Sequence, residues 1–171
     1  MQGEEGEAAA RLAEAQAPTP AGTYLVIVDE TPECELALRF AARRARRTGE
    51  DLAIAHVIRP PQFVQWGRVQ DMIAVRAEEA AAATLALAAR EAEALLGRPV
   101  ATVLLHGKPA DAVTAHLRDH PEIRSLVLAT AARGRPGPLV EHFAGERAGT
   151  LPCLVILVPG GLDAAALDRL T

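Results

Sequence analysis

Five short apolar stretches, each bounded by polar or turn-forming residues, constrain the fold of this chain more than any other feature. They lie at residues 23–30, 51–58, 100–106, 124–129 and 153–158. Their centres are continuously apolar rather than alternating, which is typical of strands that are buried on both faces of a parallel sheet. We therefore expect five strands in one sheet with helices on both of its sides.

Segments with helical patterning alternate with these strands. Helices are expected at 32–47, 69–97, 109–119, 138–149 and 162–170. Thr31 followed by Pro32 is typical of a helix N-cap and first turn. The alternation predicts a single doubly wound α/β domain whose five parallel strands lie in the order 3-2-1-4-5.

The bulk properties suit one globular domain and exclude some classes of partner. The chain has 171 residues, enough for a sizeable core, and only 3% of them are aromatic, so Ala, Val, Leu and Ile must fill that core. With a net charge of −4, binding to nucleic acid is not expected. The basic run at 43–47 fits the last turn of a helix, where cations complement the dipole.

The first 20 residues are rich in Ala and Glu and predict a flexible or frayed tail, followed by a domain over 21–171. They lack the basic-then-apolar order of a signal peptide, and no apolar run approaches the length of a membrane span. We expect a cytoplasmic protein that does not contact a membrane. Cys34 and Cys153 have no metal-ligand spacing, although a first helical turn at Cys34 could lower its thiol pKa.

Residues that follow the strands are the candidates for a binding site, because ligands of open parallel sheets lie beyond the carboxyl ends of the strands. The turn "VDETPE" after the first strand is neither a dinucleotide-binding nor a P-loop turn, and the chain has no G-x-S-x-G elbow. Two places remain: Asp29 after the first strand, and the loop 130–137 after the fourth. Asp29 could accept hydrogen bonds from a ribose or stabilise the next helix through its dipole. The loop's N–H groups could hold phosphates.

Three stretches together resemble the universal stress protein family. They are "LVIVDETPECELALRFAARRARRTGEDLAIAHVI", "HGKPADAVTAHL" and "VLATAARGRPGPLVEHFAGERAGTLPCLVILVPG", and they span roughly residues 22–160. The resemblance implies a fold like that of the adenine nucleotide alpha hydrolases, and a homodimer formed through the strand at 153–158.

The ATP-binding motif of that family is degenerate in this chain. ATP-binding members share Gly-x-x-Gly and, further on, Gly followed by Ser or Thr. Here the first two glycines are replaced by Ala129 and Ala132. The third falls on His142, or on Gly145 with a small insertion, and neither is followed by Ser or Thr.

The resemblance also implies which residues would contact a nucleotide such as ATP or AMP. The nucleoside would lie near Asp29, Thr31 and Val57, and the phosphates near Ala129, Thr130, Ala132, Arg133, Gly134, Arg135 and Gly137. The two arginines suit phosphate oxygens geometrically, but solvated loop cations would look the same in sequence. Gly134 and Gly137 favour a turn whatever the ligand.

We therefore predict a dimeric regulatory or adaptor protein whose binding of adenine nucleotides is weak or lost, with no catalytic residues and no metal site. Two alternatives stay open: an ATP-binding protein with a modified phosphate loop, and an ATP-using enzyme of the related group. A further protein partner is possible in either case. Phe63 and Trp66 fall in one loop, which could cover the sheet, form a lid or contact a partner.

Overall fold

The computed structural model describes residues 22–60, 67–145 and 147–171. The predicted tail over residues 1–20 lies outside the described residues, as do Phe63 and Trp66.

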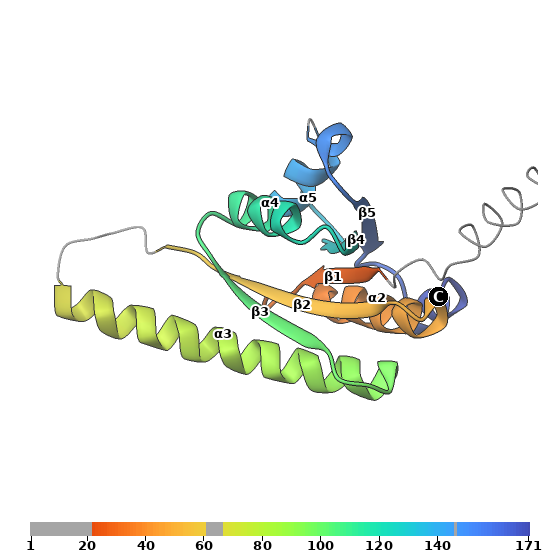
Figure 1. The fold of residues 1–171 in the computed structure, drawn as a ribbon, viewed down its shortest axis with the longest axis horizontal. Helices are drawn as coiled ribbons and strands as arrows, with labels where there is room; N and C mark the ends of the chain where they lie inside the picture. The colour runs from red at the N-terminus through yellow and green to blue at the C-terminus, as the bar shows by residue number, and fades with distance from the viewer. Residues whose placement is uncertain (1–21, 61–66, 146) are drawn as a thin grey trace, which may run out of the picture.

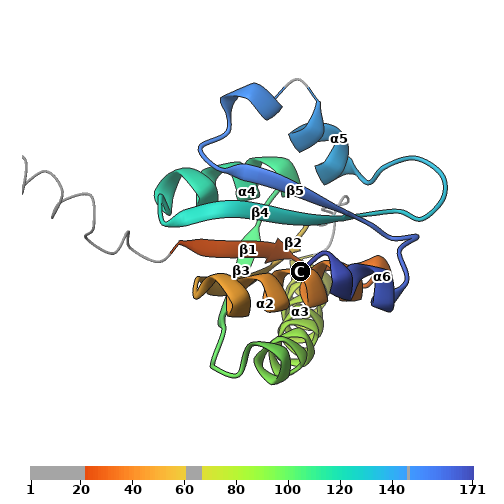
Figure 2. The same cartoon turned by 90° about the vertical axis from the view of Figure 1, so that its right-hand side faces the viewer.

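One parallel sheet forms the centre of the molecule (Figures 1 and 2). Its strands are β1 (Thr23–Ile27), β2 (Asp51–Ile58), β3 (Ala101–His106), β4 (Ile123–Thr130) and β5 (Leu154–Pro159). They are hydrogen-bonded in the order β3-β2-β1-β4-β5, and every pairing is parallel. This confirms the predicted fold class and strand order.

Helices cover both faces of the sheet, as Figure 2 shows in an end-on view. On one face lie α2 (Glu33–Thr48), α3 (Gly67–Leu96) and the C-terminal α6 (Ala164–Arg169). On the other lie α4 (Pro109–Asp119) and α5 (Pro138–Ala144), with a short 3-10 helix, η1 (Ala148–Thr150), before β5. The chain therefore crosses to one face after β1 and to the other after β4.

The two faces of the sheet bury separate cores. Val26, Ile54 and Val127 point toward α2 and α3, while Leu25, Leu126 and Leu128 pack with Phe143 of α5 on the opposite side. The predicted burial on both faces holds for the central strands β1 and β4. It is wrong for the two edge strands, which have a neighbour on one side only: no residue of β3 is buried, and Leu154 of β5 is 70% exposed.

Three predicted boundaries are wrong. The first strand, expected over 23–30, ends at Ile27. The helix expected over 138–149 ends at Ala144, because Gly145 leaves helical geometry and the chain then forms η1. Thr31 does not cap α2: the N-cap position is Pro32, which has no side-chain cap, and the Thr31 hydroxyl bonds to Asp29 instead.

Candidate functional site

The carboxyl ends of β1 and β4 lie side by side, and the chain leaves them toward opposite faces of the sheet. Such a switch point opens a crevice between the two departing loops. Asp29, Thr31, Ala129 and Gly137 all line a cavity of about 80 Å³ at this place. The structure therefore brings together the end of β1 and both ends of the loop 130–137.

Asp29 is held by a compact local network. Its Oδ1 accepts hydrogen bonds from the Thr31 N–H at 2.8 Å, the Thr31 hydroxyl at 2.5 Å and the Cys34 thiol at 3.0 Å. Partial burial raises the pKa of Asp29, but the hydrogen bonds from Cys34 and Thr31 outweigh that effect and hold the pKa below its ordinary value. All three bonds use Oδ1, and Oδ2 accepts none from the described part of the chain. One carboxylate oxygen thus stays available to a ligand.

Cys34 completes this network from the first turn of α2. Burial, and secondly the hydrogen bond to the Asp29 carboxylate, raise the pKa of its thiol to about 11. The expectation that the helix start lowers this pKa is therefore wrong, because desolvation and a neighbouring anion both disfavour the thiolate. At neutral pH the thiol is a hydrogen-bond donor that fixes the Asp29 side chain.

A larger cavity, of about 400 Å³, adjoins Asp29 on the side of β2 and α4. It is lined by Ile27, Val28, Asp29, Glu30, Thr31, His56, Val57, Arg59, Pro109 and Leu139. Its size lies within the range of small-molecule sites, roughly 300–1,000 Å³. Asp29, Thr31 and Val57, the three residues predicted to lie near a nucleoside, therefore share one cavity.

Sequence reasoning missed two polar residues of this cavity. His56 is fixed by a contact of 2.9 Å between its Nδ1 and the Val28 carbonyl oxygen. Arg59 lines both the 400 Å³ and the 80 Å³ cavity. Arg59 follows the end of β2 directly, so the same strand-end rule that selected Asp29 would have found it.

The middle of the loop 130–137 does not reach either cavity. Ala129 and Gly137 line the smaller one, whereas Thr130, Ala132, Arg133, Gly134 and Arg135 line neither. Arg135 is 92% exposed, and its Nε lies 3.7 Å from Glu141 Oε1. Contact of these five residues with phosphate stays a prediction.

The backbone of this loop is compatible with its alanines. Among the described residues only glycines have positive φ, and in this loop Gly134 alone does, at 90°. Ala129 and Ala132 are therefore unstrained here. A cost would arise only if a bound phosphate required them to adopt a left-handed backbone or to approach it closely.

Gly160, after β5, is a third residue that lies outside the predicted site. Its N–H donates to the Thr130 carbonyl oxygen at 2.8 Å, which ties the C-terminal segment to the start of the loop. A Cβ at this position would clash with the Glu33 side chain and would lie 2.6 Å from the Thr130 oxygen. Only glycine allows this close approach.

Two features are absent from the part of the chain that the structure describes. None of its helices has both the length and the apolar character needed to cross a membrane. No group of three or more His, Cys, Asp or Glu side chains within it is placed to hold a metal ion.

The chain is similar in fold to solved universal stress proteins. One is UspA from Lactobacillus plantarum, at 19% identity and a TM-score of 0.68, covering 82% of this chain and 99% of that one. Another comes from Burkholderia pseudomallei, at 18% identity and a TM-score of 0.65, covering 83% and 99%. A third is a universal stress protein from Archaeoglobus fulgidus in complex with dAMP, at 22% identity and a TM-score of 0.58, covering 81% and 98%.

Sequence comparisons point the same way. No curated protein matches the sequence significantly. The sequence profile described as "Universal stress protein family" matches residues 22–159, which include all five strands. The chain belongs to the universal stress protein family.

Proposed function

We propose that this protein is a dimeric regulatory or adaptor domain of the universal stress type, in which binding of adenine nucleotides at the β1/β4 crevice is weak or lost. The observation that carries the proposal is the position of the loop 130–137. Its two arginines and Gly134 line neither cavity of the crevice, and alanines stand where ATP-binding relatives have glycines.

Nucleotide binding would require the backbone of that loop to approach the phosphates. Phosphate is held by backbone N–H groups that approach it closely, and a Cβ at Ala129 or Ala132 obstructs this. If both residues had to adopt positive φ, the cost would be about 1 kcal/mol or more for each, which weakens affinity roughly 10- to 30-fold. The Ser/Thr hydroxyl after the third glycine is also missing.

The main alternative is that nucleotide binding persists through different contacts. Arg59 and Asp29 both line the two cavities, and Asp29 Oδ2 accepts no hydrogen bond from the described residues. A guanidinium there would suit a phosphate, and the carboxylate would suit a ribose hydroxyl. Similar folds have been solved with dAMP and with cAMP, so monophosphates are the nucleotides to test beside ATP.

Calorimetric titration with ATP, ADP, AMP and cAMP, each with and without Mg²⁺, tests the proposal. We expect dissociation constants in the high micromolar range or no measurable heat. Sub-micromolar binding of any of these would overturn it. In that case the same titration of Arg59→Gln and of Arg133→Gln/Arg135→Gln would show which arginines hold the phosphates in place of the family's glycine-rich loop.

A gain-of-function variant makes the test sharper. Ala129→Gly/Ala132→Gly restores the two family glycines and removes both Cβ obstructions. If the alanines are what weakens binding, this variant should bind ATP at least about tenfold more tightly than the natural sequence. No gain would mean that the loss lies elsewhere in the loop.

The regulatory role, the homodimer and a cytoplasmic location are parts of this proposal that rest on family membership and on the exposed β5 edge. An ATP turnover assay separates the proposal from the enzyme alternative. We expect no release of ADP or pyrophosphate above the background of a protein-free sample. Turnover that Asp29→Asn abolishes would favour an enzyme.

A further inference from the structure

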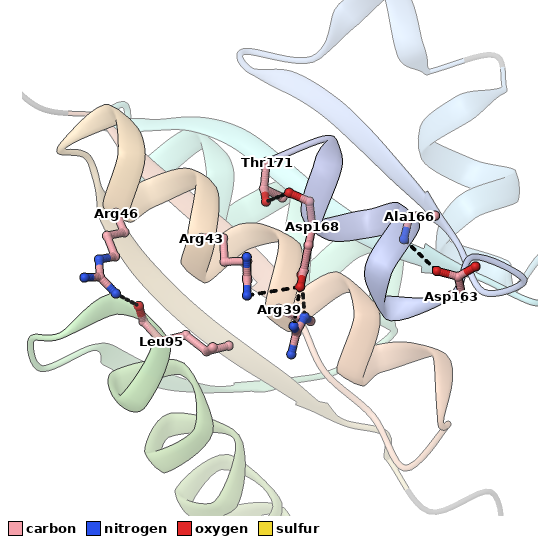
Figure 3. Close-up of polar contacts among 8 residues, drawn as sticks. All are labelled: Arg39, Arg43, Arg46, Leu95, Asp163, Ala166, Asp168 and Thr171. Carbon is pink, nitrogen blue, oxygen red and sulfur yellow. Dashed lines mark hydrogen bonds and ion pairs between the residues drawn. The ribbon is translucent and has the colours of Figure 1, made fainter.

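A third cavity, outside the crevice, lies where the C-terminal half of α2 meets the end of α3 and α6. Its volume is about 490 Å³, and it is lined by Arg43, Arg46, Arg47, Ala94, Leu95, Asp168 and Thr171. Figure 3 shows how the side chains of α2 extend toward α3 and α6 around it. Three of the four arginines of the basic run, Arg43, Arg46 and Arg47, therefore line this cavity.

The charges in this cavity do not balance. Asp168 is the single acidic side chain that lines it. Arg39 neutralises this carboxylate, because its Nε and Nη2 donate to the two carboxylate oxygens at 2.7 and 2.6 Å. Arg43 Nη2 also lies 3.1 Å from Asp168 Oδ2. The C-terminal ends of α2 and α3 add only about half a negative charge each, and even a free carboxylate on Thr171 would leave the three lining arginines in excess. The cavity therefore keeps an excess of positive charge.

The three lining arginines also have donors to spare. Arg46 and Arg47 each donate through Nη1 to a main-chain oxygen, of Leu95 at 3.3 Å and of Thr171 at 2.7 Å. The Nε of Arg43 is buried and has no partner among the described residues. Guanidinium groups form paired, charge-assisted hydrogen bonds with phosphate oxygens. Since positions 43, 46 and 47 lie on neighbouring turns of one helix face, an extended anion can reach all three.

We propose that this cavity, which we call the α2–α6 basic cavity, binds the polyphosphate moiety of a small molecule. The phosphates occupy the space between Arg43, Arg46 and Arg47, and Arg39 keeps Asp168 neutralised. A ligand bound there also contacts α6 beside Asp168 and Thr171, so binding stabilises the docking of α6 on α2.

Calorimetric titration with inorganic triphosphate, without Mg²⁺ and at low ionic strength, is the primary test. We expect one site whose affinity falls as salt is added. Arg46→Gln/Arg47→Gln changes two exposed residues and should weaken binding by more than about tenfold. The matched control, Arg76→Gln/Arg118→Gln, makes the same change in net charge at exposed positions elsewhere and should bind as the natural sequence does.

Three outcomes would overturn the proposal: no binding of triphosphate at millimolar concentration, equal weakening in the matched control, or loss of binding in Arg133→Gln/Arg135→Gln instead. Amide chemical shifts localise the site independently, and they should move at residues 39–47, 94–95 and 168–171. Parallel titration with ATP distinguishes the source of the phosphates. If Arg46→Gln/Arg47→Gln weakens ATP and triphosphate alike, a nucleotide can supply them; if it weakens triphosphate alone, the site takes inorganic chains.

Discussion

The thiol of Cys34 donates a hydrogen bond to Asp29 Oδ1 over 3.0 Å, and the Asp29 N–H donates back to the same sulfur at 3.3 Å. This reciprocal pair joins the end of β1 to the first turn of α2. It sets the direction in which the Asp29 carboxylate enters the crevice, and it ties the protonation of one residue to that of the other.

The first prediction concerns the reactivity of Cys34. Because its pKa is raised from 9.0 to about 11, its thiolate fraction at neutral pH is about a hundredfold smaller than that of an unperturbed thiol. Iodoacetamide should therefore modify Cys34 very slowly at pH 7.5 in the folded protein, and much faster as the pH approaches 11. Mass spectrometry of peptides that contain Cys34 measures the rate.

Two comparisons separate the effect of the Asp29 charge on the pKa of Cys34 from the effect of burial. Asp29→Asn removes the anion that disfavours the thiolate and should move the labelling of Cys34 to lower pH. Denaturant should make both cysteines react at ordinary rates. Fast labelling of native Cys34 at pH 7.5 would contradict the network. The raised pKa of Cys34 also makes the free energy of unfolding depend on pH. The contribution of the protonated thiol is fully present below pH 9 and is lost as the pH rises toward 11.

The second prediction concerns Gly160. Gly160→Ala places a Cβ against Glu33 and the Thr130 carbonyl oxygen, so the β4 end or the C-terminal segment must shift. We expect the free energy of unfolding to fall by about 1–3 kcal/mol. Gly161→Ala is the matched control, because nothing lies within 4 Å of its added Cβ. Urea denaturation of both variants tests this; equal stabilities would show that the close approach is unimportant.

The third prediction separates the two ways in which α6 is held on the domain. Leu167 is 1% exposed and belongs to the core beneath α2, so Leu167→Ala should cost about 2–4 kcal/mol of unfolding free energy. Asp168→Asn breaks ion pairs whose side chains are about one-third exposed and therefore partly screened by water, so it should cost less. Denaturation curves at low and high salt test this. A larger loss for Asp168→Asn than for Leu167→Ala would mean that charge, not burial, docks α6.

The fold could be predicted from sequence because its signal is repeated and local. Five continuously apolar stretches alternate with helical segments, and a parallel sheet with right-handed crossovers leaves few topologies for that pattern. Edge position is not a local property, however. The sequence of β5 is as apolar as that of β4, and only the strand order shows that Leu154 faces solvent.

The candidate site could be predicted in part for the same reason. Asp29 and Val57 sit at strand ends, and parallel strands bring their ends to one edge of the sheet. The path of the loop 130–137 depends instead on long-range packing, including the bond from Gly160 to Thr130. From sequence, the basic run at 43–47 is explained by cations that complement the dipole at the end of a helix. Nothing in the local sequence shows that α6 returns to pack beside it.

The last prediction is the homodimer. In the described structure β5 is hydrogen-bonded on one side only, to β4, and its Leu154 and Leu157 are 70% and 37% exposed. The segment after Pro159 leads to α6, which packs on α2 through Leu167 and the Arg39–Asp168 pair, rather than over this edge. An apolar strand edge of this kind is normally paired or covered.

Light scattering at micromolar concentration should therefore return twice the mass of the chain. Leu154→Lys/Leu157→Lys should weaken the dimer by more than about tenfold, since each leucine buried is worth about 1.5–3 kcal/mol. Leu170→Lys, at the exposed position that follows α6, should leave the mass unchanged. A natural protein that scatters as one chain at high micromolar concentration would refute the dimer.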